Sequence, residues 1–321
     1  MRSPSSDHFR ALILSEDSSN NAFLFNLLPW FRGVCHFAQI VRPLFWLNRH
    51  EVSESTKFRI RNARHSGAVQ DDMSGKNYRV VQTGQRTNVE GKQVSNKVLL
   101  ATPDNEYELM RPDLTYIDLP DHLSLHEPTQ SIEFVYFPNR GMVSQVVVTK
   151  DGRTVEVGVV GNEGYVGAGL AVGLSRSSVR EIMQIAGDGF RMMGNALERI
   201  LRSAPQLQVI LNRHSGLQGM QVAQTAACNR LHDIQQRLSR WLLMTQDRVK
   251  LGVLPITHDF VATMMGTDRS TVSLAAAVLQ KKGIIDYVRG AVKIVNRRKL
   301  EKSACECYAV IQQFEDELGL R

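Results

Sequence analysis

The sequence predicts an α+β fold in two parts, and three observations support this prediction. Residues 114–193 contain short runs of β-branched and aromatic residues separated by turn signals, a pattern typical of an antiparallel β-roll or sandwich. Residues 196–245 lack proline except Pro205 and carry apolar residues at helical spacing. Residues 254–296 indicate two short helices and a hairpin. We therefore expect a β-roll followed by a helical carboxyl-terminal part.

The composition is that of a globular chain with room for two domains. Of the 321 residues, 43% are hydrophobic and 22% are charged, and no apolar run reaches the roughly 18 residues of a membrane span. The net charge of +7 points weakly to an anionic partner. Four cysteines are too few for a disulfide scaffold and match no zinc-finger spacing, so we expect a reducing, cytoplasmic location and no metal site. These cysteines are Cys35, Cys228, Cys305 and Cys307.

The amino-terminal region, residues 1–97, reads as an extension of the folded part. Its polar stretches bury too little apolar area to offset the entropy of ordering, so we expect it to be largely disordered. An apolar island at 23–47 is broken by Pro29 and Pro43. The island is interpreted as a docking segment or as the result of a gene start placed upstream of Met73. A membrane-surface anchor is the alternative, because basic residues flank aromatic ones.

The β-roll is expected to span residues 98–195. Asp151-Gly152 lies between two of its β-branched runs, and this pair suits the positive φ angles of a type I′ hairpin turn. The strands are predicted at 132–137, 143–149, 154–160 and 182–185.

A glycine-rich stretch and two histidines in this region raise the question of a ligand or a metal. Gly167-Ala168-Gly169 cannot open a dinucleotide fold, because no long amphipathic helix follows to bind phosphate. The glycines therefore indicate either a close approach to a small ligand or corners of the roll. His122 and His126 would share a face of a strand, but no third metal ligand is recognisable, so we interpret them as surface histidines. No catalytic motif is present, and we do not predict an enzyme.

Residues 196–228 are predicted to form a long helix that serves as a dimerisation helix. An interface between subunits or a core within the chain would produce the same stripe. The stripe consists of Leu207, Ile210, Leu211, His214 and Leu217, continued by Met220 and Gln224.

Residues 229–300 predict a winged helix-turn-helix. Thr257 and Asp268 are suited to cap the two helices, Gly266 permits the turn between them, and Gly283 ends the second helix. Arg289-Gly290 forms the tip of the wing, and residues 301–321 are expected to form a further helix. Residues 251–300 hold eight basic residues against three acidic ones, which suits contact with the phosphates of double-stranded DNA. The predicted DNA-binding residues are Thr257, Asp268, Arg269, Ser270, Thr271, Ser273, Leu274 and Arg289.

The order of these parts resembles the CRP/FNR family of transcription regulators over roughly residues 99–296. The motifs that carry the resemblance are Arg269-Ser270-Thr271-Val272, Gly283-Ile284-Ile285 and the Arg289-Gly290 wing. The resemblance implies an antiparallel, jelly-roll-like β-roll effector domain, a long dimerisation helix and a carboxyl-terminal winged helix-turn-helix. It further implies a homodimer that binds a pseudo-palindromic operator, responds to a small effector and acts with RNA polymerase.

The chain departs from the members of this family that respond to cAMP. Their Gly-Glu-Leu turn corresponds here to Gly167-Ala168-Gly169, which lacks the carboxylate, and Arg176-Ser177 stands near their Arg-Ser pair. Val222 occupies a helix position that carries a hydroxyl in those members. The sequence therefore predicts a divergent member without cAMP binding, and Cys35 alone cannot supply the cysteine cluster of the iron–sulfur branch. Two alternatives are a cupin-like metal enzyme and a winged-helix module for protein interaction.

Overall fold

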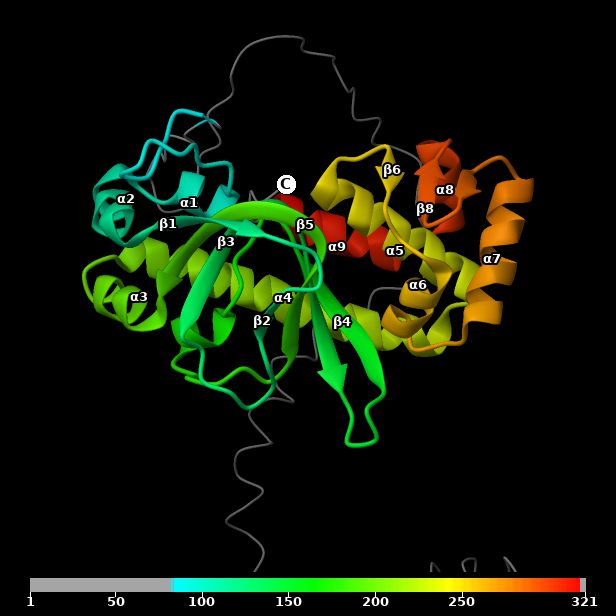
Figure 1. Ribbon diagram of the computed structural model, residues 1–321, viewed down its shortest axis with the longest axis horizontal. Helices are drawn as coiled ribbons and strands as arrows, with labels where there is room; N and C mark the ends of the chain where they lie inside the picture. Colours follow the sequence, from blue (N-terminus) through cyan, green and yellow to red (C-terminus); the bar gives the residue numbers. More distant parts are fainter. Residues whose placement is uncertain (1–81, 83, 318–321) are drawn as a thin grey trace, which may run out of the picture. The chain divides into compact units, whose positions relative to one another are not determined.

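The computed structural model describes residue 82 and residues 84–317. The apolar island at 23–47, Met73 and the end of the predicted tail helix, residues 318–321, lie outside the described residues. All described residues belong to one compact unit of the chain, Val69–Arg321, and their helices and strands are drawn in Figure 1. Within this part, no helix is both long and apolar enough to cross a membrane.

The segment before the first helix, residues 84–96, is packed, contrary to the disorder that its polar composition predicted. The Asn96 side chain is buried and donates hydrogen bonds to the carbonyl oxygens of Pro138 (2.9 Å) and Gly164 (2.7 Å). Arg86 is buried as well and donates to the carbonyl oxygen of Thr102 (2.9 Å). These partners are distant in sequence, so composition alone could not reveal that the segment is held in place.

The roll is a sheet with strand order β1-β5-β3-β4, in which β2 also pairs with β5 and all pairs are antiparallel. The predicted β-roll is confirmed. The predicted strands at 132–137 and 143–149 form one strand, which bends through register shifts between Pro138 and Val143. The strands are β1 (Thr115–Leu119), β2 (Ser124–His126), β3 (Phe134–Val148), β4 (Thr154–Val160) and β5 (Arg180–Met193). Short helices flank them: α1 (Lys97–Ala101), α2 (Asp104–Met110), η3 (Arg111–Asp113) and η4 (Ala168–Val172).

The β3–β4 hairpin forms as predicted, but the predicted turn type is wrong. Gly152 has φ +81°, whereas Asp151 is not among the described non-glycine residues with positive φ, and a type I′ turn needs positive φ at both. The Gly152 N–H donates to the carbonyl oxygen of Thr149 (2.9 Å) in a longer loop. Asp151 is held locally, because Thr149 and Arg153 both donate hydrogen bonds to its carboxylate.

The helical region at 196–228 is divided. It contains two helices, α3 (Gly194–Leu201) and the longer α4 (Pro205–Leu231). The second helix begins at Pro205 because proline is favourable only in the first turn of a helix. Leu207, Leu211 and His214 of the predicted stripe are buried, and both leucines belong to the core of the roll. The first part of the stripe therefore packs within the chain, as the second interpretation held, whereas Met220, which continues the stripe, is exposed. Figure 1 shows α4 running behind the strands of the roll toward the carboxyl-terminal module.

The carboxyl-terminal module contains a three-stranded sheet in the order β6-β8-β7. Its elements are α5 (Ile234–Val249), β6 (Val253–Leu254), α6 (His258–Met264), α7 (Arg269–Lys281), β7 (Ile285–Val288), β8 (Ala291–Ile294), α8 (Arg297–Ser303) and α9 (Cys307–Glu317). The winged helix-turn-helix is confirmed. The tail, predicted as one helix over 301–321, instead contains the end of α8 and α9, separated at residues 304–306.

Candidate nucleic-acid interface

The turn between α6 and α7 is built by two caps and one glycine. Thr257 Oγ1 accepts a hydrogen bond from the Phe260 N–H (3.2 Å), and Asp268 Oδ1 accepts one from the Thr271 N–H (2.8 Å). Hydrogen bonds from the hydroxyl groups of Ser270 and then Thr271 hold the pKa of Asp268 well below its usual range. Gly266 adopts φ +61°, which a side chain would strain. Asp268 is therefore ionised at neutral pH and fixes the start of α7.

The face of α7 that was predicted to point outward is divided between exposed and half-buried residues. Arg269, Ser270 and Leu274 are exposed, and 71% of the Leu274 surface is accessible. Thr271 and Ser273 are half-buried. The opposite face packs into the core through Val272, Ala275, Ala276 and Leu279. Three of the predicted residues are therefore exposed on α7, and the other two are partly covered.

His258 of α6 contacts α7, a role that the sequence did not predict. Its Nδ1 lies 2.9 Å from Ser273 Oγ, and its ring lies 3.9 Å from the Tyr287 ring between centroids. Burial, and secondarily the charge of Arg269, lowers the pKa of His258. The position of His258 directly after the N-cap Thr257 does not by itself predict a contact with Ser273 of the next helix. The ring therefore joins α6, α7 and β7 in neutral form.

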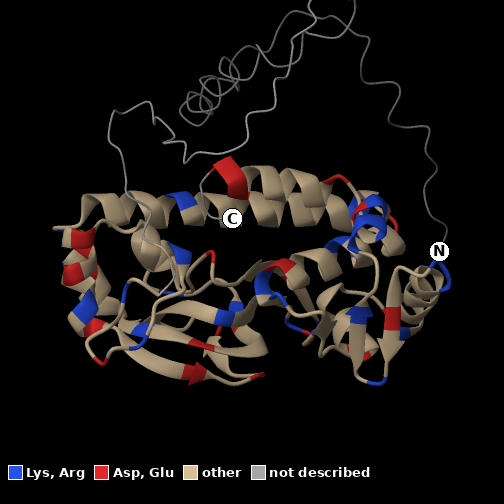
Figure 2. Cartoon of the chain, turned by 90° about the horizontal axis from the view of Figure 1, so that it is seen from above, with Lys and Arg blue, Asp and Glu red and all other residues tan. Residues whose placement is uncertain are grey.

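The wing and the last short helix supply further basic residues. Arg289 is exposed in the β7–β8 turn, where Gly290 has φ +79°. In the backbone cartoon of Figure 2, Lys and Arg positions cluster on α8, the helix that begins at Arg297. Arg297 is engaged within the chain, because it donates hydrogen bonds to Asp247 (2.6 Å) and to the Tyr308 hydroxyl group (2.6 Å). The local positive charge that can meet phosphate is therefore smaller than the count over 251–300 predicts.

Comparison with known proteins agrees with this geometry. Residues 236–303 match the family model of the Crp-like helix-turn-helix domain. The c-di-GMP-responsive global regulator CLP of Xanthomonas campestris is 16% identical, with a TM-score of 0.51 over 59% of this chain and 98% of that chain. FixK2 from Bradyrhizobium japonicum is 15% identical, with a TM-score of 0.51 over 60% of this chain and 98% of that chain. A search of curated protein sequences found no match.

The chain has the fold of CRP/FNR transcription regulators, with a helix-turn-helix DNA-binding domain. The resemblance found in the sequence is thereby confirmed. The matches favour neither the cupin-like enzyme nor the interaction module.

In this CRP/FNR fold, a buried acid links the roll to the DNA-binding module. The Glu156 carboxylate of β4 accepts hydrogen bonds from Ser144 Oγ (2.5 Å) and from Trp241 Nε1 of α5 (2.8 Å). Burial raises the pKa of Glu156 to about 7, against the lowering effect of these donors. Arg237 of α5 also donates to the carbonyl oxygen of Met265 (2.6 Å), directly before the helix-turn-helix glycine. Polar contacts thus join β4, α5 and the turn that positions α7.

A second link runs through Arg248 of α5. Its guanidinium group lies 2.8 Å from Glu163 of the roll and 2.9 Å from Glu315 of α9, and all three side chains are buried. The charge of Arg248 lowers the pKa of Glu163, although burial acts in the opposite direction. One cation therefore holds two carboxylates, one from the roll and one from α9.

The CRP/FNR roll contains a cavity, but not where the sequence placed a ligand. The cavity has a volume of about 630 Å³, and its lining includes His126, Glu127, Glu133 and Arg176. Of the predicted pocket residues, only Arg176 lines it. Gly167 has φ +91° and leaves no room for a side chain beside His126, so it marks a corner of the roll.

The remaining predicted pocket residues are not brought together. Ala168 and Gly169 lie in η4, Ser177 Oγ donates a hydrogen bond to the carbonyl oxygen of Val179 (2.7 Å), and Val222 is exposed on α4. The space between α4 and β4 is filled instead, because Gln221 Oε1 accepts a hydrogen bond from the Val159 N–H (2.6 Å).

The interpretation of the two histidines as a surface pair is wrong for His126. His122 precedes β2 with φ +63° and is exposed, so the two rings do not share the face of a strand. His126 is buried, with Nδ1 2.6 Å from Glu181 Oε2 and Nε2 2.8 Å from the carbonyl oxygen of Phe134. Both ring nitrogens thus have partners within the roll. The register of β2 shifts between Ser124 and His126, and the spacing of the two histidines could not predict this shift.

Proposed function

We propose that this chain acts in the cytoplasm as a homodimer that binds a pseudo-palindromic operator and regulates transcription with RNA polymerase. The observation that carries the proposal is the exposed basic start of α7, where Arg269 and Ser270 lie beside a fixed helix cap. A helix presented in this way fits the major groove with its first residues against base edges.

Arg269 is the residue best suited to direct base recognition. Its side chain is 68% exposed and forms a long ion pair, 3.5 Å to the similarly accessible carboxylate of Asp259. Such a pair exchanges readily for guanine O6 and N7, which an arginine binds through two hydrogen bonds. Leu274 on the same face suits contact with a thymine methyl group. We expect half-sites that combine a guanine with a nearby thymine.

The outer face of α4 supports the homodimer. It presents small and apolar residues at helical spacing on the side away from the roll, and a side chain added at Gly216 would meet open space. Two copies of such a helix can pack closely along this face. The exposed residues are Val209, Gly216, Met220, Ala223, Ala227 and Leu231. A two-fold axis along α4 then predicts half-sites about 34 Å apart.

The cavity of the roll supports control by a small effector. Its lining includes both carboxylates and a guanidinium group, so a polar ligand with hydrogen-bonding groups fits better than an apolar one. The contacts of Glu156 and Arg237 offer a route by which movement of the roll would reach α7. Identification of the effector rests on ligand screening against this cavity.

Two arginine substitutions test the proposal with a matched control. On duplexes enriched from a random pool, we expect Arg269→Ala to cost about 1–3 kcal/mol at one base position and to relax the preference there. We expect Arg289→Ala to weaken all duplexes alike and to reduce the salt slope by about 1. Arg199→Ala serves as the control, because Arg199 is an exposed arginine of α3 paired with Asp113 (3.0 Å).

Fluorescence anisotropy over a series of salt concentrations measures all three variants. Unchanged specificity in Arg269→Ala, together with an effect of Arg199→Ala as large as that of Arg289→Ala, would show that α7 is not the reading helix.

A further inference from the structure

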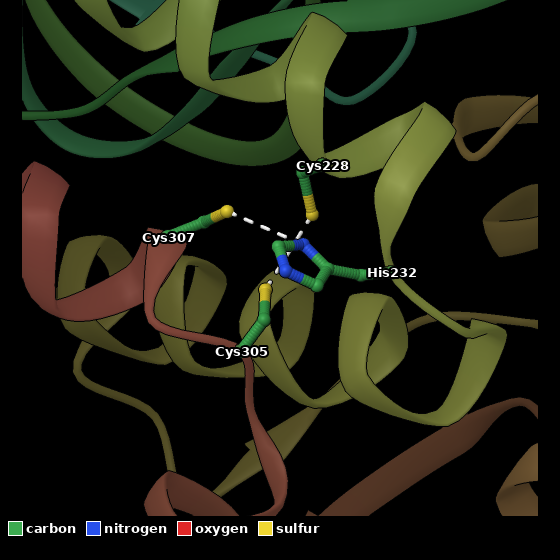
Figure 3. A group of neighbouring side chains, drawn as sticks. All are labelled: Cys228, His232, Cys305 and Cys307. Atoms are coloured by element: carbon green, nitrogen blue, oxygen red, sulfur yellow. Dashed lines mark hydrogen bonds between the residues drawn. The ribbon is translucent and has the colours of Figure 1, made fainter.

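Three cysteines and one histidine meet where α4 ends and α9 begins. Cys228 lies in the last turn of α4, His232 caps that helix at its carboxyl end, and Cys305 and Cys307 flank the start of α9. One ligand atom from each residue lies within 4.8 Å of all the others. Figure 3 shows the three sulfur atoms and the imidazole ring turned toward one another. The cysteines are buried and the histidine is half-buried.

The spacing of these atoms fits one tetrahedral metal ion. Cys228 Sγ lies 3.5 Å from Cys305 Sγ, and Cys307 Sγ lies 3.5 Å from His232 Nδ1. Bonds of about 2.3 Å to sulfur and 2.0–2.1 Å to nitrogen place tetrahedral ligands about 3.5–3.8 Å apart. A cluster of several iron atoms would hold its sulfur ligands farther apart. The group is therefore of the right size for a single ion.

The surrounding side chains orient the ligands as they do in metal sites. Nε2 of His232 lies 3.1 Å from a carboxylate oxygen of Glu306, which favours a proton on Nε2 and leaves the Nδ1 lone pair facing Cys307. Gln224 Nε2 donates a hydrogen bond to Cys307 Sγ (3.0 Å), a contact that stabilises a thiolate.

We propose that Cys228, His232, Cys305 and Cys307 form a structural Zn²⁺ site. Three thiolates and one imidazole are the Cys₃His set of closed, four-coordinate zinc sites, and all four positions are supplied by the chain. Binding of the ion releases the three thiol protons and involves no change in oxidation state. The spacing of these residues does not predict the site, because its two halves lie more than seventy residues apart and meet only when α9 folds back on α4.

The site would fix the junction between the two parts of the regulator. His232 is followed by Asp233, which caps α5 with Gln236 in a capping box, so the ion holds the residue directly before the N-cap of α5. The same ion holds the start of α9, whose Glu315 pairs with Arg248 of α5. Zinc would therefore stabilise the position of α5 and α9 relative to the end of α4.

The test measures zinc in the full chain purified from cells grown with Zn²⁺ and under reducing conditions. We expect about one zinc ion per chain by mass spectrometry, and less than about a tenth of that in Cys305→Ser and His232→Ala. Cys35→Ser is the matched control, since Cys35 is the one cysteine outside the group, and it should retain the zinc. Replacement of Zn²⁺ by Co²⁺ should give the visible absorption of a tetrahedral thiolate site.

A measurement on the unmodified chain covers the case in which a variant fails to fold. The rate of thiol modification is compared before and after chelation, and we expect three additional thiols to react once the chelator removes zinc. Wild-type protein without zinc and without cobalt–thiolate absorption would overturn the proposal. The absorption spectrum of an iron–sulfur cluster, or undiminished zinc in Cys305→Ser, would also overturn it.

Discussion

Replacing Glu156 by glutamine should stabilise the protein above neutral pH. The carboxylate is buried between β4 and α5, and burial raises its pKa from 4.5 to about 7. Glutamine keeps an oxygen that can accept the Trp241 N–H, and its amide group can donate to Ser144 Oγ. The substitution therefore removes the buried negative charge while leaving both contacts possible.

The magnitude follows from the difference between the two pKa values. Because the folded pKa is the higher one, folding favours the protonated acid, and the stability that this provides is complete below pH 4.5. It is lost as the pH rises through about 7, up to about 3 kcal/mol. At pH 8 the wild-type chain carries this cost and Glu156→Gln does not. At pH 5 the two proteins should differ little.

Urea unfolding followed by circular dichroism at pH 5, 6, 7 and 8 measures the effect. The control is Glu127→Gln. Hydrogen bonding by Ser124 lowers the pKa of Glu127, so the stability that this carboxylate provides is already complete above pH 4.5, and the difference between Glu127→Gln and wild type should stay constant from pH 5 to pH 8. A difference between Glu156→Gln and wild type that stays constant from pH 5 to pH 8 would refute the reasoning.

Two further predictions concern the links within and between chains. Arg248→Met should lower the free energy of unfolding by about 3–5 kcal/mol in thermal or urea unfolding, because it leaves the buried Glu163 and Glu315 without their cation; equal stability of the variant and wild type would contradict the link. Met220→Asp should shift the protein from dimer to monomer in sedimentation, whereas Leu123→Asp, at an equally exposed apolar residue outside α4, should not. An unchanged dimer in Met220→Asp would place the interface elsewhere.

The helix-turn-helix could be predicted closely because its signals are local. Thr257, Asp268 and Gly283 act within one helical turn of their own positions, so the sequence pattern and the structure coincide there. The burial of His126 depends on Glu181, and the packing of residues 84–96 depends on the sheet. Such long-range partners have no periodic signature in the sequence. The meeting of Cys228 with Cys305 was missed for the same reason.

The apolar stripe on α4 contains both buried and exposed residues. Leu207 and Leu211 satisfy the apolar stripe by packing in the roll, and Met220 of the same stripe lies on the exposed side. Periodicity indicates which residues share a face of a helix but not what that face contacts, so it could not separate a core from an interface here.

The most direct measurement is selection of duplexes from a random pool by the purified full chain, followed by sequencing. We expect enrichment of two inverted half-sites whose centres lie about 34 Å apart, with the preference at one base pair lost in Arg269→Ala. A pool that remains unenriched, or enrichment that Arg269→Ala leaves unchanged, would contradict the assignment of α7 as the helix that reads DNA.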